Sequence, residues 1–73
     1  PFENIELEEA KQTLAKAINI LPEKEKMVVT LYYYEELTLK EISLILKLSE
    51  ARVSQLHTKA VIRLKGALAN KTI

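Results

Sequence analysis

The chain has no cysteine, which excludes disulfides, thiolate metal sites and a cysteine nucleophile. Its single histidine, His57, cannot form a metal site alone. One glycine and two prolines among 73 residues provide almost no β-turn chemistry. No apolar run approaches the ~18 residues that a membrane span needs, and the acidic start is unlike a signal peptide. We therefore expect a soluble, intracellular protein without metal or cofactor.

The composition is that of one small globular domain. Hydrophobic residues make up 48% and charged residues 29%, far from the pattern of disordered chains. We expect residues 1–73 to form a single domain with one small core. Because the chain begins with Pro1 instead of Met, we also expect it to be a piece of a longer protein.

Catalytic patterns are missing as well. The sequence has no glycine-rich phosphate loop and no Ser/His/Asp order that a few helices could assemble. Its paired glutamates fall where helices begin, and helix capping explains them there. We predict a protein that is not an enzyme and has no small-molecule substrate.

The net charge of +1 conceals an asymmetry between the two halves. Residues 1–36 hold eight acids and four bases, whereas residues 37–73 hold two acids and seven bases. The second half therefore attracts phosphate and the first repels it, which favours a polyanion bound to the second half only.

Apolar residues recur at helical spacing throughout, which predicts an all-α bundle of four helices. The first helix is expected near residues 5–19 with Asn4 as its N-cap, and the second from Pro22 in its first turn to about Glu36. The first helix and the residues after it carry one apolar stripe, which consists of Leu7, Ala10, Leu14, Ala17, Ile18 and Leu21.

The third and fourth helices have the pattern of a helix-turn-helix. Thr38 and Glu41 form a capping box before a short helix, Lys47 and Leu48 interrupt the pattern, and Ser49 caps a longer helix. Ile42 and Val53 are expected to point inward between the two.

The outward side of the last helix is small, polar and neutral at its centre. At about 100° per residue, it consists of Ala51, Ser54, Gln55, Thr58 and Lys59, with Glu50, Arg52 and His57 on the flanks. Short side chains permit close approach to a DNA major groove, and cations at the rim suit phosphates. Gln55 can bond to adenine and the Ala51 methyl can contact thymine, which predicts an A·T-leaning site.

These segments resemble region 4 of bacterial RNA polymerase sigma factors. Residues 38–65 resemble region 4.2 and residues 21–36 resemble region 4.1. The strings YYEELTLKEI, from Tyr33, and RVSQLH, from Arg52, resemble the flagellar and motility class of alternative sigma factors. The likeness divides the domain into a region 4.1-like part, about 5–36, and a helix-turn-helix part, 38–68.

The resemblance implies cytoplasmic promoter recognition in bacteria, in which the last helix reads the −35 element. It also implies docking on the β-subunit flap of RNA polymerase core, and anti-sigma factors bind such surfaces in this family. The implied base-reading residues are Glu50, Ala51 and Gln55. The residues expected near DNA or its phosphates are Thr38, Lys40, Ser49, Arg52, Ser54, Thr58 and Lys59.

The sequence departs from the family pattern at the turn and at the reading helix. Lys47 stands where glycine is common, so it must adopt a costlier backbone conformation unless the turn finds another geometry. Glu50 and Ala51 replace the Arg-Glu of primary sigma factors, which again favours an A·T-richer element.

The three consecutive tyrosines and the histidine carry weaker signals. Tyr32, Tyr33 and Tyr34 are consecutive, so at least one should reach the surface, where it could contact polymerase or an anti-sigma factor. His57 is expected to be a partly buried structural residue.

The alternatives to a sigma factor are the output domain of a LuxR-type regulator, which would dimerise on symmetric DNA, and a purely protein-binding bundle.

Overall fold

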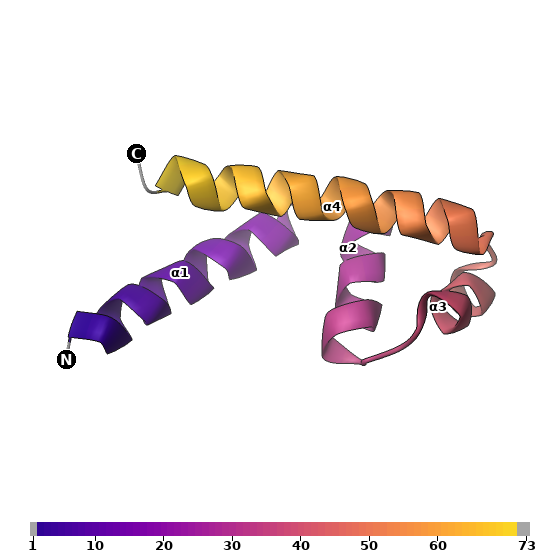
Figure 1. Cartoon of the computed structure of the whole chain (residues 1–73), viewed down its shortest axis with the longest axis horizontal. Helices are drawn as coiled ribbons and strands as arrows, with labels where there is room; N and C mark the ends of the chain where they lie inside the picture. The colour runs from indigo at the N-terminus through magenta and orange to yellow at the C-terminus, as the bar shows by residue number, and fades with distance from the viewer. Residues whose placement is uncertain (1, 72–73) are drawn as a thin grey trace.

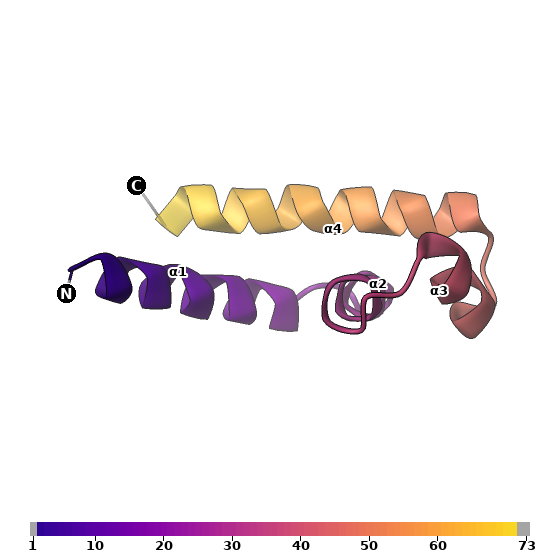
Figure 2. The same ribbon diagram turned by 60° about the horizontal axis from the view of Figure 1, so that its bottom comes forward.

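The computed structural model describes residues 2–71, which form four α-helices and one π-helical turn. The long helix α4 (Glu50–Lys71) spans the molecule. The helices α1 (Phe2–Asn19), α2 (Glu23–Val29) and α3 (Leu39–Leu46) lie along one side of it (Figures 1 and 2). The molecule is elongated, at 44 × 21 × 15 Å. The all-α class and the helix-turn-helix are confirmed.

Helix α1 differs from the prediction at its N-terminal end. It begins at Phe2, so Asn4 lies within the helix and is not its N-cap. Of the expected apolar stripe, Ala17 is buried but Leu7 is 53% exposed. The reason is visible in Figure 1, where α1 and α4 diverge toward the N-terminus, so that only the C-terminal part of α1 is covered.

Helix α2 begins one residue later than predicted, and the second half of the predicted helix has a different winding. Pro22 is the N-cap with extended backbone, and its carbonyl accepts a hydrogen bond from the Lys26 N–H at 2.9 Å. Regular α-helix stops at Val29, and the chain continues as a π-helical turn, η1 (Thr30–Tyr34). Glu36 then takes a positive φ of 56°, which turns the chain toward α3.

The predicted caps around α3 are confirmed. The Thr38 hydroxyl accepts from the Glu41 N–H at 3.1 Å, and the Glu41 carboxylate accepts from the Thr38 N–H at 2.8 Å. The Ser49 hydroxyl accepts from the Arg52 N–H at 3.0 Å at the start of α4. Lys47 ends α3 with a left-handed φ of 59°, so the turn accepts the cost of a side chain where glycine would be relaxed.

The core has two adjoining parts, both built on α2 and α4. One part joins Val28, Ile42, Val53 and Leu56. The predicted inward pair, Ile42 and Val53, is fully buried there. The other part joins Leu21, Val29 and Ala60.

A partly buried ion pair, not anticipated from the sequence, links α2 to the C-terminal half of α4. The Arg63 Nε donates to the Glu25 carboxylate at 2.9 Å, and the Glu25 side chain is only 5% exposed. Glu25 was expected merely to complement the dipole at the start of its helix. The partners are 38 residues apart, so only tertiary folding brings them together.

None of the helices described between residues 2 and 71 combines the length and the apolar character needed to cross a membrane.

Candidate DNA-binding surface

The outward strip of α4 is exposed as the helical spacing predicted. Its members Ala51, Ser54, Gln55, Thr58 and Lys59 are all exposed, as are Glu50 and Arg52 at its flank. On the opposite side, Val53, Leu56 and Ala60 are buried. The helix is thus fixed to the core by one face and presents short polar groups on the other.

Gln55 has a neighbour that orients its amide. The Arg52 Nη1 donates to the Gln55 Oε1 at 3.5 Å, one helical turn away. An adenine contact requires the same oxygen to accept from N6 while the amide nitrogen donates to N7. Because a carbonyl oxygen has two lone pairs, Arg52 can stay bound while Gln55 contacts a base.

Two further exposed polar residues lie at the start of α3. Thr38 and Lys40 are both exposed, as a contact to a DNA backbone would require. The Thr38 N–H is already bound to the Glu41 carboxylate, and its hydroxyl accepts from the Glu41 N–H while its own proton can turn to a nearby acceptor. Hydrogen bonds to the Glu41 carboxylate, from the Thr38 backbone N–H first and from the Thr38 side chain second, lower the pKa of Glu41 below its usual value.

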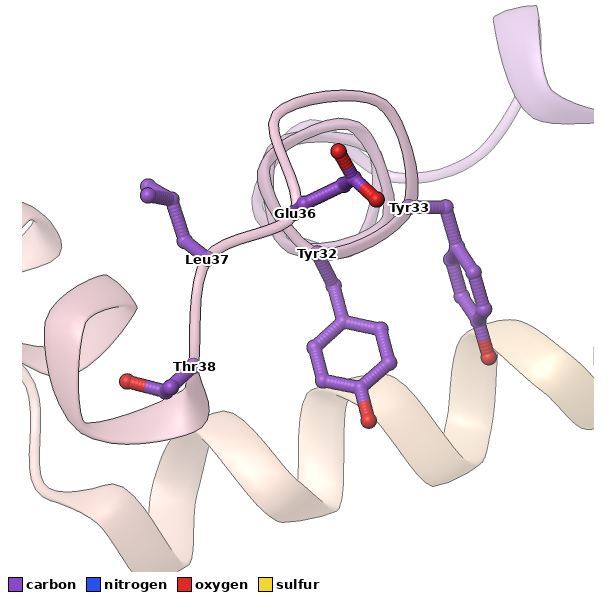
Figure 3. A pocket seen from close by; sticks show the side chains of 5 residues that line it. All are labelled: Tyr32, Tyr33, Glu36, Leu37 and Thr38. Carbon is purple, nitrogen blue, oxygen red and sulfur yellow. The ribbon is translucent and has the colours of Figure 1, made fainter.

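The three tyrosines differ in exposure. Tyr33 and Tyr34 are 53% and 66% exposed, which confirms that at least one reaches the surface. Tyr32 is half-buried and packs against the core. Figure 3 shows Tyr32 and Tyr33 side by side, both directed toward α4, at a pocket of about 400 Å³ that Glu36, Leu37 and Thr38 complete.

His57 is half-buried, as predicted, but its contacts were not foreseen. The Tyr33 hydroxyl lies 2.8 Å from the His57 Nε2, and the two rings stack at 5.6 Å. The Tyr32 ring lies 5.0 Å from the same imidazole. Sequence reasoning missed this cluster because it assumed regular α-helical steps of 100° through the tyrosines, whereas the structure winds them as a π turn.

An apolar groove on the side formed by α2, η1 and α3 was also missed. It has a volume of about 270 Å³ and is lined by Glu23, Lys26, Met27, Thr30, Leu31 and Ile45. Met27 is 39% exposed and Ile45 is 56% exposed. None of the lining residues belongs to α4, so the groove and the outward strip can be occupied at the same time.

A helix-turn-helix with an exposed polar reading helix defines a DNA-binding domain of the transcription-factor type. Residues 17–66 match the family model "Sigma-70, region 4", and the chain belongs to this family.

The curated relatives are RNA polymerase sigma factors. The chain is 57% identical over 60 residues to the RNA polymerase sigma factor FliA of Yersinia enterocolitica, covering 82% of this chain and 26% of that protein. It is 50% identical over 68 residues to the RNA polymerase sigma-D factor of Bacillus subtilis, covering 93% and 27%. The chain thus spans about a quarter of the length of these curated relatives.

A solved structure has the same fold. It is the cocrystal structure of the flagellar sigma/anti-sigma complex Sigma-28/FlgM, with a TM-score of 0.82 and 44% sequence identity. The match covers 93% of this chain and 29% of the other.

Proposed function

We propose that this chain recognises the −35 element of promoters with α4 in the major groove, while it is docked on the β flap of RNA polymerase core. It acts as the region 4 domain of a flagellar or motility-type sigma factor. The observation that carries the proposal is the exposed strip of small polar residues on α4, in a chain of the sigma region 4 family. Binding is non-covalent and without turnover, and it takes place in the bacterial cytoplasm, where promoters are.

Base reading falls to Glu50, Ala51 and Gln55. Gln55 bonds to the N6 and N7 atoms of adenine, and the Ala51 methyl contacts a thymine methyl. Glu50 lies at the edge of the site, where its carboxylate can accept from a base amino group. The strip has no guanidinium at its centre, which supports an A·T-leaning element.

The residues around the strip hold the sugar-phosphate backbone. Lys59 and Arg52 supply charge from α4, and Lys40 with the Thr38 hydroxyl supplies contacts from α3. The positive end of α4, capped by Ser49, adds a favourable dipole for phosphate. Ser54 and Thr58 are short enough to allow the backbone to approach.

Polymerase docks on the side of the domain formed by α2, η1 and α3. The groove beside Met27, Leu31 and Ile45 is apolar, exposed and separate from the reading strip, which suits an apolar segment of the flap. The exposed rings of Tyr33 and Tyr34 offer further contact area near it on η1.

An anti-sigma factor is a further partner. The structural relative is a sigma factor bound to the anti-sigma factor FlgM. We propose that this chain binds a protein of that kind, and that such binding competes with polymerase.

Family membership does not favour the two alternatives. A LuxR-type output domain would dimerise on half-sites about one helical turn apart. A purely protein-binding bundle would show no salt-sensitive DNA affinity, because it neutralises no phosphates.

An NMR titration of the isotope-labelled chain tests the proposal. At low salt, an A·T-rich −35 duplex should shift the amide signals of residues 38–59, and a flap segment should shift those of Met27, Leu31 and Ile45. Shifts with DNA but not with the flap, together with dimerisation, would support the LuxR-type regulator. No response to either ligand at high concentration would contradict the proposed function.

A further inference from the structure

A polar contact between η1 and α4 lies beside the reading strip. The Tyr33 hydroxyl is 2.8 Å from the His57 Nε2, across 24 residues of sequence. The two rings stack with an interplanar angle of 26°, and the Tyr32 ring meets Tyr33 edge-on with centroids 4.8 Å apart. His57 is therefore held by one directional bond and by two aromatic rings.

The position of His57 on α4 connects this contact to the strip. His57 follows Gln55 by two residues, which places their side chains on nearly opposite sides of a helix. His57 faces η1, and Gln55 faces solvent. Any rotation of α4 about its axis that breaks the bond to Tyr33 therefore turns Gln55 by the same angle.

The apolar core alone fixes the rotation of α4 about its axis less precisely than a hydrogen bond does. Val53, Leu56 and Ala60 determine which face of α4 points inward, but apolar contacts have no preferred direction. A hydrogen bond weakens steeply as its distance and angle depart from the optimum. A bidentate base contact demands the same accuracy, because both of its bonds must form together.

The π-helical winding of η1 brings the tyrosines to the contact with His57. A π-helical turn is rare and occurs often at functional sites. Here it directs both Tyr32 and Tyr33 toward α4, as Figure 3 shows, whereas Tyr34 stays 66% exposed.

We propose that the bond between Tyr33 and His57 sets the rotation of α4 and hence the angle at which Gln55 meets its base. The proposal rests on the proposed function. Tyr33 is a positioning residue: it touches no base and acts through His57.

The test compares Tyr33→Phe with Tyr32→Phe, which removes a hydroxyl from the neighbouring ring at the same imidazole. Each variant of the complete protein is assembled with polymerase core. Its affinity is measured for two promoter duplexes that differ only at the base pair whose discrimination Gln55→Ala abolishes. Tyr33→Phe should lower the affinity ratio about threefold to tenfold, the worth of one hydrogen bond. Tyr32→Phe should leave the ratio unchanged.

Two further measurements separate positioning from a merely structural role. The ¹⁵N signal of the His57 Nε2 should move in Tyr33→Phe and stay in Tyr32→Phe. His57→Phe keeps a stacked ring but removes the nitrogen. The double variant Tyr33→Phe/His57→Phe should lower the affinity ratio no further than either single variant.

Three outcomes would count against the idea. Equal ratios for Tyr33→Phe and Tyr32→Phe would overturn the positioning role and leave the proposed function standing. Weaker binding of both duplexes by the same factor in Tyr33→Phe would also overturn it, since lost stability alone acts that way. If the unaltered protein does not discriminate between the duplexes, the proposed function fails, and this proposal fails with it.

Discussion

At the scale of single residues, Gln55 is the side chain on which base recognition depends. Its amide is exposed and is oriented by Arg52 at 3.5 Å. Gln55→Ala deletes the adenine contact and should reduce discrimination at one base pair by about 1–3 kcal/mol. Binding to duplexes that carry each base in turn measures this, with Gln12→Ala, on the exposed surface of α1, as the matched control. Unaltered discrimination at every position would refute the assignment.

Lys59 is expected to contact phosphate and not a base. Its ammonium group is exposed on the outward strip and contributes charge without sequence preference. Lys59→Ala should weaken all duplexes alike and should reduce the slope of log affinity against log salt by roughly one unit. Lys16→Ala, at the exposed end of α1, removes an equal charge outside the proposed interface and should leave the slope as it was. If both variants have the original slope, Lys59 neutralises no phosphate.

At the scale of elements, the features that could be predicted from the sequence are those that depend on near neighbours. The capping box joins Thr38 to Glu41, three positions further along the chain, and the cap from Ser49 to Arg52 has the same separation. Both were predicted, and so was the exposed strip, because helical spacing determines which residues share a face. The π turn at Thr30–Tyr34 was not, because residues with ordinary helical propensities leave no mark of a wider winding.

The cap on α3 gives the fold a dependence on pH. Hydrogen bonds from Thr38 lower the pKa of Glu41 in the folded state, so its contribution is present above the unfolded pKa and is lost as pH falls through the folded one. The Thr38 amide signal should therefore move below pH 4.5, the usual value for glutamate, along with the Glu41 carboxyl signal. Glu41→Gln should abolish this movement. A Thr38 amide signal that titrates equally in both proteins would contradict the cap as its cause.

The turn between α3 and α4 stores strain at Lys47. Its φ of 59° is unfavourable for any residue with a Cβ, so Lys47→Gly should raise the free energy of unfolding by about 0.5–1 kcal/mol. Lys47→Ala loses the same amine but keeps the Cβ, and should show no such gain. Urea denaturation compares the two. If they have equal stability, the left-handed backbone is not a source of strain.

At the scale of the whole molecule, contacts between distant segments decide the arrangement, and these could not be predicted. The stripe on α1 was extended to Leu7, yet that residue is 53% exposed because α1 diverges from α4 (Figure 1). The bond between Tyr33 and His57 spans 24 residues, and the pair of Glu25 and Arg63 spans 38. Helical spacing indicates which face is apolar, but not which distant element covers it.

The Glu25 and Arg63 pair links α2 to α4. Removing Arg63 leaves a carboxylate unpaired in a site that is 5% exposed, which costs more than the pair itself contributes. Because the Arg63 side chain is 56% exposed and water screens it, Arg63→Met should lower the free energy of unfolding by about 1–3 kcal/mol, less than for a fully buried pair.

The double variant Glu25→Leu/Arg63→Met decides whether charge burial is the cause. With no carboxylate left to desolvate, it should recover most of the stability that Arg63→Met loses. Denaturation in urea measures both variants. If the double variant is as unstable as Arg63→Met, the loss comes from the missing Arg63 stem against α1 and α2 instead of from the unpaired charge. In that case the ion pair does not hold the two helices together.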